Sequence, residues 1–286
     1  MELNNEIIEL CRELKLSTIE NEYHTISTTA AKENWQYTQF LHEMLKIEVE
    51  NRMDRSKNIL TKLAGFPAIK TLEQFDYSFS VGVNRKQIEE LATLTFIKRN
   101  ENIILLGQCG VGKTHLAIAL AFKAVQHRYK ARFTTISELL SLANNAKKEK
   151  KYDSFLKSIT NPSILVIDEI GYFNRRENKK IQMYLFIERV KEEANHFFQI
   201  ISKRYEKGST ILTSNLVFSK WTQVFAGDKI VTTAILDRVL HHSHIINIQG
   251  DSYRLKEKKE NGIINSDVYK FGAKSSDKMV EKTELV

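Results

Sequence analysis

Glycine and proline are both absent from the first 64 residues, and the chain of 286 residues holds only two cysteines. Because Cys11 and Cys109 lie in different regions, the sequence argues against a disulfide framework and a cysteine-based zinc site. No apolar run is long enough to cross a membrane. The first ten residues carry three glutamates and no base, unlike a secretory signal. We therefore expect a cytoplasmic globular protein with no membrane partner.

The net charge of +8 is distributed unevenly along the chain. Residues 1–76 hold 9 lysines and arginines against 13 acidic residues, whereas residues 77–286 hold 34 against 22. A basic domain attracts polyanions, because phosphates that bind lysine or arginine release their counterions. Charge alone leaves two interpretations open: a nucleic-acid partner, or surplus lysine on a solvated surface.

The segment before Gly65 has the residue spacing of amphipathic helices. Apolar residues recur there at intervals of three and four in two stripes: Ile7, Leu10, Cys11 and Leu14, then Phe40, Met44 and Ile47. We expect both stripes to pack against neighbouring helices. The pattern predicts a small all-helical domain of residues 1–68, which ends after Gly65-Phe66-Pro67. Residues 70–79 have no clear period and predict a connector.

The rest of the chain alternates short apolar runs with helical stretches, the pattern of a parallel sheet built from βαβ units. The predicted strands are residues 103–106, 132–135, 164–167, 210–213 and 245–248. The third is almost entirely apolar, as expected of a strand buried on both faces. We expect an α/β domain of residues 69–256, with helices flanking its parallel sheet. A polar, poorly ordered tail of residues 257–286 follows.

The segment GQCGVGKT, residues 107–114, matches the phosphate-binding pattern G-x-x-x-x-G-K-[ST]. It follows the apolar run IILL and precedes a helix-forming stretch, which is the context that such a loop requires. Its glycines let backbone N–H groups approach phosphate oxygens, and the next helix directs its N-terminus at the anion. Lys113 is expected to reach the β- and γ-phosphates, and Thr114 to ligate Mg²⁺. The predicted ATP-binding residues are Gly107, Gly110, Val111, Gly112, Lys113, Thr114 and His115.

Asp168 and Glu169 end the apolar run ILVI. A buried strand carries both carboxylates to the carboxyl edge of the sheet, where ligands bind in open α/β folds. Asp168 is expected to hold Mg²⁺, and Glu169 to orient and deprotonate the attacking water. Without a phosphate-binding loop, such a pair would be an ordinary strand end. The later strand STILTSN ends at Asn215, which either caps a turn or contacts the γ-phosphate or the water.

Five segments, in this order, carry a resemblance to a known family: GQCGVGKTHLA, LVIDEIGY, ISKRYEKGSTILTSN, FSKWTQVF and AILDRVLHHSHIINIQGDSYRLK. Together they resemble the IstB family, the ATP-binding helpers of insertion-sequence transposons. That family is similar to DnaC-type helicase loaders and the DnaA initiator, all of the AAA+ class. The resemblance implies a P-loop AAA+ fold. It also implies ATP-dependent homo-oligomers that bind double-stranded DNA and deliver it to a transposase.

The resemblance further implies roles for three residues. Asn215 would be a sensor at the end of its strand, and Arg254 a second sensor that contacts the γ-phosphate within its own subunit. Arg238 would be an arginine finger that acts on the ATP of a neighbouring subunit, so hydrolysis would depend on assembly. The adjacent His241 and His242 lack a metal-binding spacing, and we expect them to be structural.

Two lysine- and arginine-rich clusters are candidates for contact with DNA phosphates. The first consists of Lys147, Lys148, Lys150 and Lys151, and the second of Arg175, Arg176, Lys179 and Lys180. The alternative for each cluster is a solvated surface. Residues 178–198 are additional to the family pattern and have helical spacing, which predicts either a lengthened helix or a small helical hairpin.

We therefore expect an Mg-dependent ATPase that assembles on duplex DNA and stimulates a cognate transposase. A DnaC-like replicative helicase loader is the first alternative, and it would prefer single strands. A small-molecule kinase is the second, although the sequence has no convincing lid over the phosphates. An inactive product of a degenerate element is the third. The intact GKT, DE, TSN and LDR segments argue against a lost ATPase.

Overall fold

The computed structural model describes residues 2–80, 82–171, 180–225 and 227–254, with side chains described for all of these except residues 180–187. Three helices come first: α1 (Glu2–Glu13), α2 (Ser17–Lys32) and α3 (Tyr37–Ala64). The strands are β1 (Asn102–Gly107), β2 (Ala131–Thr135), β3 (Ile164–Ile170), β4 (Ser209–Ser214) and β5 (Ser243–Ile248). The helices around them are α4 (Arg85–Leu91), α5 (Thr95–Lys98), α6 (Lys113–Gln126), α7 (Ile136–Lys148), α8 (Tyr152–Thr160), α9 (Lys180–Arg204), η1 (Phe218–Lys220), α10 (Trp221–Val224) and α11 (Lys229–Leu240).

The strands form one sheet in the order β2-β3-β4-β1-β5, and every neighbouring pair is parallel. All five strands lie where the sequence predicts them, and the predicted parallel α/β class is confirmed. Because the strands run in the same direction, they all begin at one edge of the sheet and end at the other. The carboxyl ends of β3, β4 and β1 are therefore neighbours at a single edge.

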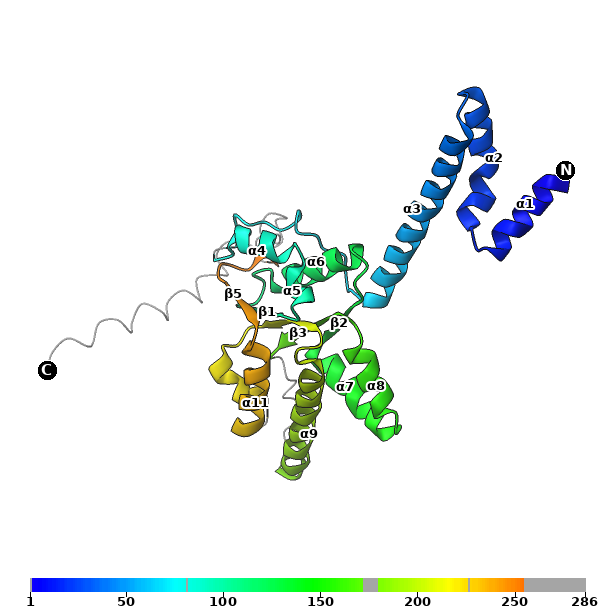
Figure 1. Cartoon of the computed structure of the whole chain (residues 1–286). Coiled ribbons are helices and arrows are strands. Elements are labelled where there is room, and N and C mark those ends of the chain that lie inside the picture. The colour runs from blue at the N-terminus through cyan, green and yellow to red at the C-terminus, as the bar shows by residue number, and fades with distance from the viewer. Residues whose placement is uncertain (1, 81, 172–179, 226, 255–286) are drawn as a thin grey trace.

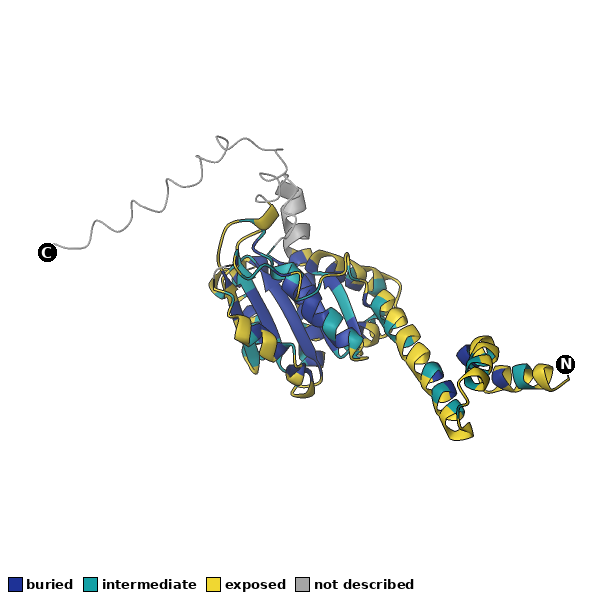
Figure 2. Cartoon of the chain, turned by 90° about the horizontal axis from the view of Figure 1, so that it is seen from above, coloured by how far each residue is buried: buried dark blue, intermediate teal, exposed yellow. Residues whose placement is uncertain are grey.

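Alternating strand residues supply the two apolar cores that lie on opposite faces of the sheet. Ile103 and Leu105 pack with α4, α5 and α6 on one face, whereas Ile104 packs with α7 to α11 on the other. Figure 1 shows α4, α5 and α6 above the sheet and α7, α8, α9 and α11 below it. The central strands β3 and β4 are buried along nearly their whole length, and buried strands appear dark blue in Figure 2, which explains the nearly continuous apolar sequence of β3.

The first three helices extend away from the sheet, with α1 and α2 at the far end of α3 (Figure 1). Their small core contains Cys11, Ile19 and Met44. The packing expected of Leu10 and Leu14 is wrong, because both side chains are more than half exposed. At its other end, α3 places Ala64 within the core on the α6 face of the sheet.

The additional residues after β3 form one long helix. The helix α9 runs without a break from Lys180 to Arg204, so the lengthened helix is correct for its described part and a hairpin is wrong there. Ala194, Phe197 and Ile201 recur at helical spacing and are buried in the core on the same face of the sheet as α7 and α8. The predicted tail, residues 257–286, lies outside the described residues. None of the described helices has both the length and the apolar character of a membrane span.

Arg204, at the end of α9, joins the segments that precede β3 and β4. Its guanidinium is 2% exposed and donates hydrogen bonds to the carbonyl oxygens of Pro162 at 2.8 Å and Ser209 at 2.6 Å. It also donates to the carbonyl of Thr160 at 3.1 Å and the hydroxyl of Thr210 at 3.2 Å. Burial lowers the pKa of Arg204 to about 10, which leaves it charged at neutral pH. These bonds fix the two segments relative to each other.

Replacement of Arg204 by methionine is expected to lower the free energy of unfolding by about 2 kcal/mol or more, because several buried carbonyl oxygens lose their donors. The measurement is urea unfolding followed by circular dichroism. Lys203→Met is the matched control, since Lys203 is exposed on the same helix turn. Its effect should stay within about 0.5 kcal/mol. Equal losses in the two variants would contradict this role of Arg204.

Glu48 of α3 caps the N-terminus of α2. Its buried carboxylate accepts hydrogen bonds from the backbone N–H groups of Thr18 at 2.8 Å and Ile19 at 3.2 Å, and from Arg52 at 3.0 Å. Burial by itself raises the pKa of Glu48. The backbone bonds, with those from the Thr18 hydroxyl and Arg52, outweigh burial and lower the pKa below its ordinary value of 4.5. The docking of α2 on α3 thus depends on an ionised carboxylate.

The substitution Glu48→Gln is expected to weaken the docking of α2 by about 1–3 kcal/mol. Because the native pKa is lowered, the stabilisation is complete above pH 4.5 and is lost as the pH falls through the native value. Amide hydrogen exchange over residues 17–32 measures both effects. Glu50→Gln, at an exposed position two residues along the helix, is the control and should leave the exchange unchanged. Equal exchange in Glu48→Gln and the parent would contradict the cap.

Candidate nucleotide-binding site

The loop of residues 107–114 connects β1 to α6 and has a backbone that depends on glycine. Gly110 and Gly112 have φ angles of +84° and +99°. A Cβ atom at Gly110 would lie 2.1 Å from the Ser252 hydroxyl oxygen, and one at Gly112 would lie 2.7 Å from Cε2 of Phe75. These two positions therefore require glycine for both their conformation and their contacts.

Lys113 is the first residue of α6, and its side chain folds back over the loop. Its Nζ donates to the carbonyl oxygens of Gly107 at 2.8 Å and Gln108 at 2.6 Å. Burial lowers the pKa of Lys113, and the positive charge of Arg254 lowers it further, whereas the negative charges of Asp168 and Glu169 oppose the shift. The ammonium group is thus held within the loop, beside the free N–H groups that begin α6.

Asp168 and Thr114 meet at the carboxyl edge of the sheet. The Thr114 hydroxyl lies 3.0 Å from each carboxylate oxygen of Asp168. The hydroxyl of Thr213, on β4, also donates to Asp168. The carboxylate is 4% exposed, and these two hydroxyls offset the loss of its hydration. The set of carboxylate and hydroxyl oxygens is chemically suited to Mg²⁺.

Glu169 follows Asp168 at an irregularity in the sheet. The pairing of β3 with β4 shifts register between Ile167 and Ile170, and Glu169 has a φ angle of +63°. Its backbone N–H donates to the Thr213 hydroxyl at 2.9 Å. The bulge exposes the Glu169 side chain while the adjacent Asp168 stays buried. Two neighbouring carboxylates thus have different environments.

Asn215 directly follows β4 at the same edge. Its side-chain oxygen is buried and has no hydrogen-bond partner among the described residues. A Cβ atom at Gly171 would lie only 2.7 Å from this oxygen, so glycine permits Asn215 to approach the end of β3. An unpaired buried oxygen is unusual in a folded protein and is a feature of sites that bind a further group.

The two predicted arginines differ in their surroundings. Arg254 follows Tyr253, whose backbone N–H donates to the carbonyl oxygen of Gly110 at 2.9 Å, so the chain after β5 lies against the loop. Arg238, on α11, donates to the carbonyl oxygen of Ala234 at 2.9 Å and lies 5.0 Å above the ring of Phe198. Arg254 is thereby brought to the loop of its own chain. The contacts of Arg238 lie on α11 and α9.

The connector before α4 covers the loop from another side, which the sequence pattern did not reveal. His115 Nε2 lies 2.9 Å from the carbonyl oxygen of Thr71, and its ring centroid lies 5.4 Å from that of Phe75. Burial lowers the pKa of His115, so its ring is neutral at pH 7. The Ser80 hydroxyl donates to the carbonyl of Val111 at 3.4 Å. The alternating aromatics of FDYSF were the available sequence signal for this contact.

The first candidate DNA cluster is partly paired with acidic residues. Lys147 Nζ lies 2.5 Å from Glu192, and Lys151 Nζ lies 3.0 Å from Glu149. Of the second cluster, Arg175, Arg176 and Lys179 lie outside the described residues, and for Lys180 only the backbone, at the start of α9, is described.

His241 and His242 have neighbours that their spacing alone did not predict. Nδ1 of His241 lies 2.7 Å from the hydroxyl of Tyr205. Potential ligand atoms of Glu206, His241 and His242 all lie within 4.8 Å of one another, and the three residues are exposed. Exposed groups of this kind are common on protein surfaces.

Replacement of Gly110 by alanine is expected to displace the segment that follows β5, because the new Cβ would overlap Ser252. Hydrogen exchange at the Tyr253 amide, which bonds to Gly110, should accelerate. Gly227→Ala is the control for backbone strain. Gly227 also has a positive φ angle, +76°, but the Cβ atom of an alanine there would meet no atom within 4 Å. Both variants should lose about 1–2 kcal/mol of stability from strain. Unchanged exchange at Tyr253 in Gly110→Ala would count against the contact.

The parallel sheet, the glycine loop before α6 and the carboxylates at the end of β3 define an α/β protein with a P-loop. The chain belongs to the family of IstB-like ATP binding proteins, which matches residues 9–261. It is 40% identical to the insertion sequence IS21 ATP-binding protein of Pseudomonas aeruginosa, over 97% of this chain and 98% of that protein.

A second relative belongs to the same kind of insertion-sequence protein, and a solved structure shows a more distant likeness. The chain is 37% identical to the insertion sequence IS5376 ATP-binding protein of Geobacillus stearothermophilus, over 90% of this chain and 96% of the relative. Among solved structures, that of DnaI has a TM-score of 0.49 and 19% identity, covering 64% of this chain and 89% of that one.

Proposed function

We propose that this protein is an ATP-dependent helper of insertion-sequence transposition, which hydrolyses Mg-ATP, assembles on duplex DNA and stimulates a cognate transposase in the cytoplasm. The observation that carries the proposal is the meeting of Thr114, Asp168 and Thr213 beside the glycine loop. Membership of the IstB-like family and the insertion-sequence relatives support the transposition role.

The glycine loop is suited to hold the phosphates of ATP. Backbone N–H groups of Gly110, Val111, Gly112, Thr114 and His115 and the positive end of α6 supply donors and positive potential. Lys113 exchanges its bonds with the loop carbonyls for the β- and γ-phosphates. The connector and the segment after β5 exclude water from the two sides of the loop.

Thr114 and Asp168 are the residues that hold Mg²⁺ in this proposal. When bound there, Mg²⁺ would supply positive charge beside the phosphates. The contact between Thr114 and Asp168 keeps both oxygens together before the nucleotide arrives. Thr213 holds Asp168 from the other side, so the carboxylate has little freedom to rotate.

Glu169 is the base that orients the attacking water and accepts its proton. Its exposed carboxylate is free of the hydroxyls that hold Asp168, and the left-handed backbone at the bulge sets its direction. Asn215 presents an unpaired oxygen at the same edge and holds the water. Arg254 contacts the γ-phosphate from within the same subunit, because the segment that carries it lies against the loop.

Arg238 completes the site of a neighbouring subunit. Its guanidinium lies over the ring of Phe198 and donates to the carbonyl oxygen of Ala234, one turn earlier on α11. A guanidinium from a second subunit stabilises the charge of the transition state, so an isolated subunit hydrolyses ATP slowly. ATP thereby acts as a switch between isolated and assembled subunits.

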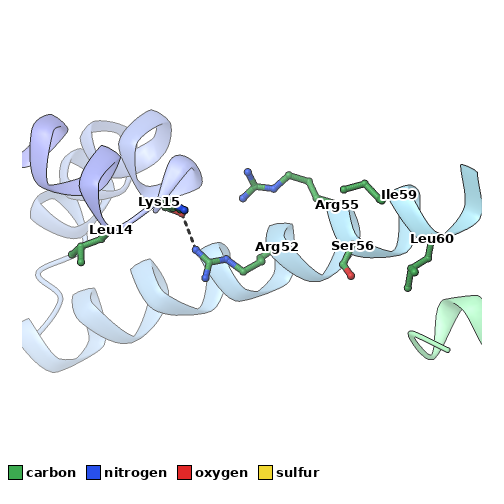
Figure 3. Close-up of a pocket in the computed structure, with 7 residues that line it drawn as sticks. All are labelled: Leu14, Lys15, Arg52, Arg55, Ser56, Ile59 and Leu60. Atoms are coloured by element: carbon green, nitrogen blue, oxygen red, sulfur yellow. Dashed lines mark hydrogen bonds between the residues drawn. The ribbon is translucent and has the colours of Figure 1, made fainter. Parts of the chain in front are cut away.

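The helical residues 1–68 serve assembly or contact with the transposase, the domain of residues 69–256 carries the ATPase site, and residues 257–286 form a tail. A stripe of exposed apolar side chains on α3 supports the first assignment: Leu41, Leu45, Val49, Met53, Ile59 and Leu63. Next to it, a groove of about 530 Å³ separates α3 from Leu14 (Figure 3). Contiguous exposed apolar side chains on a surface are typical of interaction sites.

ATP hydrolysis measured against protein concentration, with and without duplex DNA, tests the proposal. Turnover per subunit should rise steeply with protein concentration and should increase when duplex DNA is added. Arg238→Ala should lower kcat by about 10³-fold, while ATP binding is retained. Arg85→Ala, which removes an exposed arginine that pairs with Glu89, is the control and should be neutral.

Mixing two inactive variants tests whether the arginine acts between subunits. Glu169→Gln lacks the base but supplies Arg238, and Arg238→Ala lacks the finger but supplies Glu169. Their mixture should recover turnover that neither has alone. If turnover per subunit did not depend on protein concentration, duplex DNA or Arg238, the protein would be a P-loop enzyme whose site is complete within one subunit.

A further inference from the structure

The edge of the sheet opposite the nucleotide loop gathers five segments that are distant in sequence. Since the strands are all parallel, the segments that precede them meet at the amino edge. In the order of the sheet these segments precede β2, β3, β4, β1 and β5. From β2 to β1 the row spans three strand spacings, about 15 Å.

The segments at this edge are strongly basic. They comprise residues 96–101, 127–130, 157–163, 203–208 and 241–242. Seven exposed basic residues, together called the basic edge, occur in them: Lys98, Arg99, Arg128, Lys130, Lys157, Lys203 and Lys207. Their acidic residues are Glu101 and Glu206. Glu101 already pairs with His244 at 2.8 Å and Arg99 at 3.8 Å, so it offsets little of the remaining charge.

Three of these lysines line one depression. Lys157, Lys203 and Lys207 surround a volume of about 650 Å³, together with Ser158, Thr160 and Asn161. No carboxylate belongs to this lining, and within the described residues none of the three lysines has an ion pair. Ammonium, hydroxyl and amide groups that converge without an acid are suited to phosphate oxygens.

Buried hydrogen bonds fix the segments that carry this depression. Lys157 lies near the end of α8, and Lys203 and Lys207 flank the end of α9. The buried guanidinium of Arg204 joins these two regions through the carbonyl oxygens of Thr160, Pro162 and Ser209. The backbone positions of the three lysines are thus fixed before a ligand binds, which lowers the entropic cost of binding.

We propose that the basic edge, centred on Lys157, Lys203 and Lys207, binds the phosphate backbone of duplex DNA. This inference rests on the proposed function and names the DNA-binding surface. A row of about 15 Å faces about four phosphates of one DNA strand. Lysines that contact phosphates read no base, so binding here tolerates many sequences. The first candidate DNA cluster is a weaker candidate because Lys147 and Lys151 already have acidic partners.

The test combines Lys157→Gln, Lys203→Gln and Lys207→Gln in one full-length variant. The control carries Lys86→Gln, Lys220→Gln and Lys229→Gln, which remove equal charge at exposed positions outside the basic edge. Anisotropy of a labelled mixed-sequence duplex gives the affinity over a range of salt concentrations. At about 0.1 M salt the affinity of the edge variant should fall at least about tenfold, and its salt slope by about 2 to 3. Its ATP hydrolysis without DNA should equal that of the parent.

Each other outcome has a distinct meaning. A parent that binds no duplex would contradict the DNA-binding part of the proposed function itself. A parent that binds, with an edge variant of equal affinity and slope, would overturn only the basic edge. Equal losses in the edge and control variants would also overturn it, since general charge would then explain the binding. If the edge variant lost affinity for a single strand of the same sequence but kept its affinity for the duplex, the duplex would be excluded as the ligand of this surface.

Discussion

The common direction of the five strands is the constraint on which the other features depend. Because every strand ends at the same edge, Thr114, Asp168 and Asn215 become neighbours although long helices separate them in sequence. The same direction gathers the segments before the strands at the opposite edge. The sheet therefore separates a nucleotide side from a basic side, and its two apolar faces are left to the helices.

Each edge is stabilised by one buried charge with several partners. Asp168 holds the carboxyl edge through the hydroxyls of Thr114 and Thr213, and Arg204 holds the amino edge through carbonyl oxygens. A buried charge without partners would be strongly destabilising, so these bonds also specify which loops lie together. The hydrogen bonds that stabilise the fold thus also position the candidate site residues at the two edges.

The helical unit before Gly65 likewise combines an apolar core with one buried charge that has hydrogen-bond partners. Their core is small, with Cys11, Ile19 and Met44 buried, and Glu48 adds a charged cap to α2. The helix α3 carries this unit away from the sheet but ends with Ala64 in the main core. One continuous helix thus connects the unit of α1 and α2 to the face of the sheet that packs on α6.

Local sequence patterns predict the five strands, the glycine loop and the carboxylates at the end of β3, because apolar period and glycine spacing are local properties. The sequence also predicted that Cys11 and Met44 belong to packing surfaces, but not that Leu10 and Leu14 would be exposed. Only the tertiary structure placed Thr213 on Asp168, Phe75 on Gly112 and the lysines of the basic edge in one row. These contacts depend on strand order and direction, which join residues that no local pattern relates.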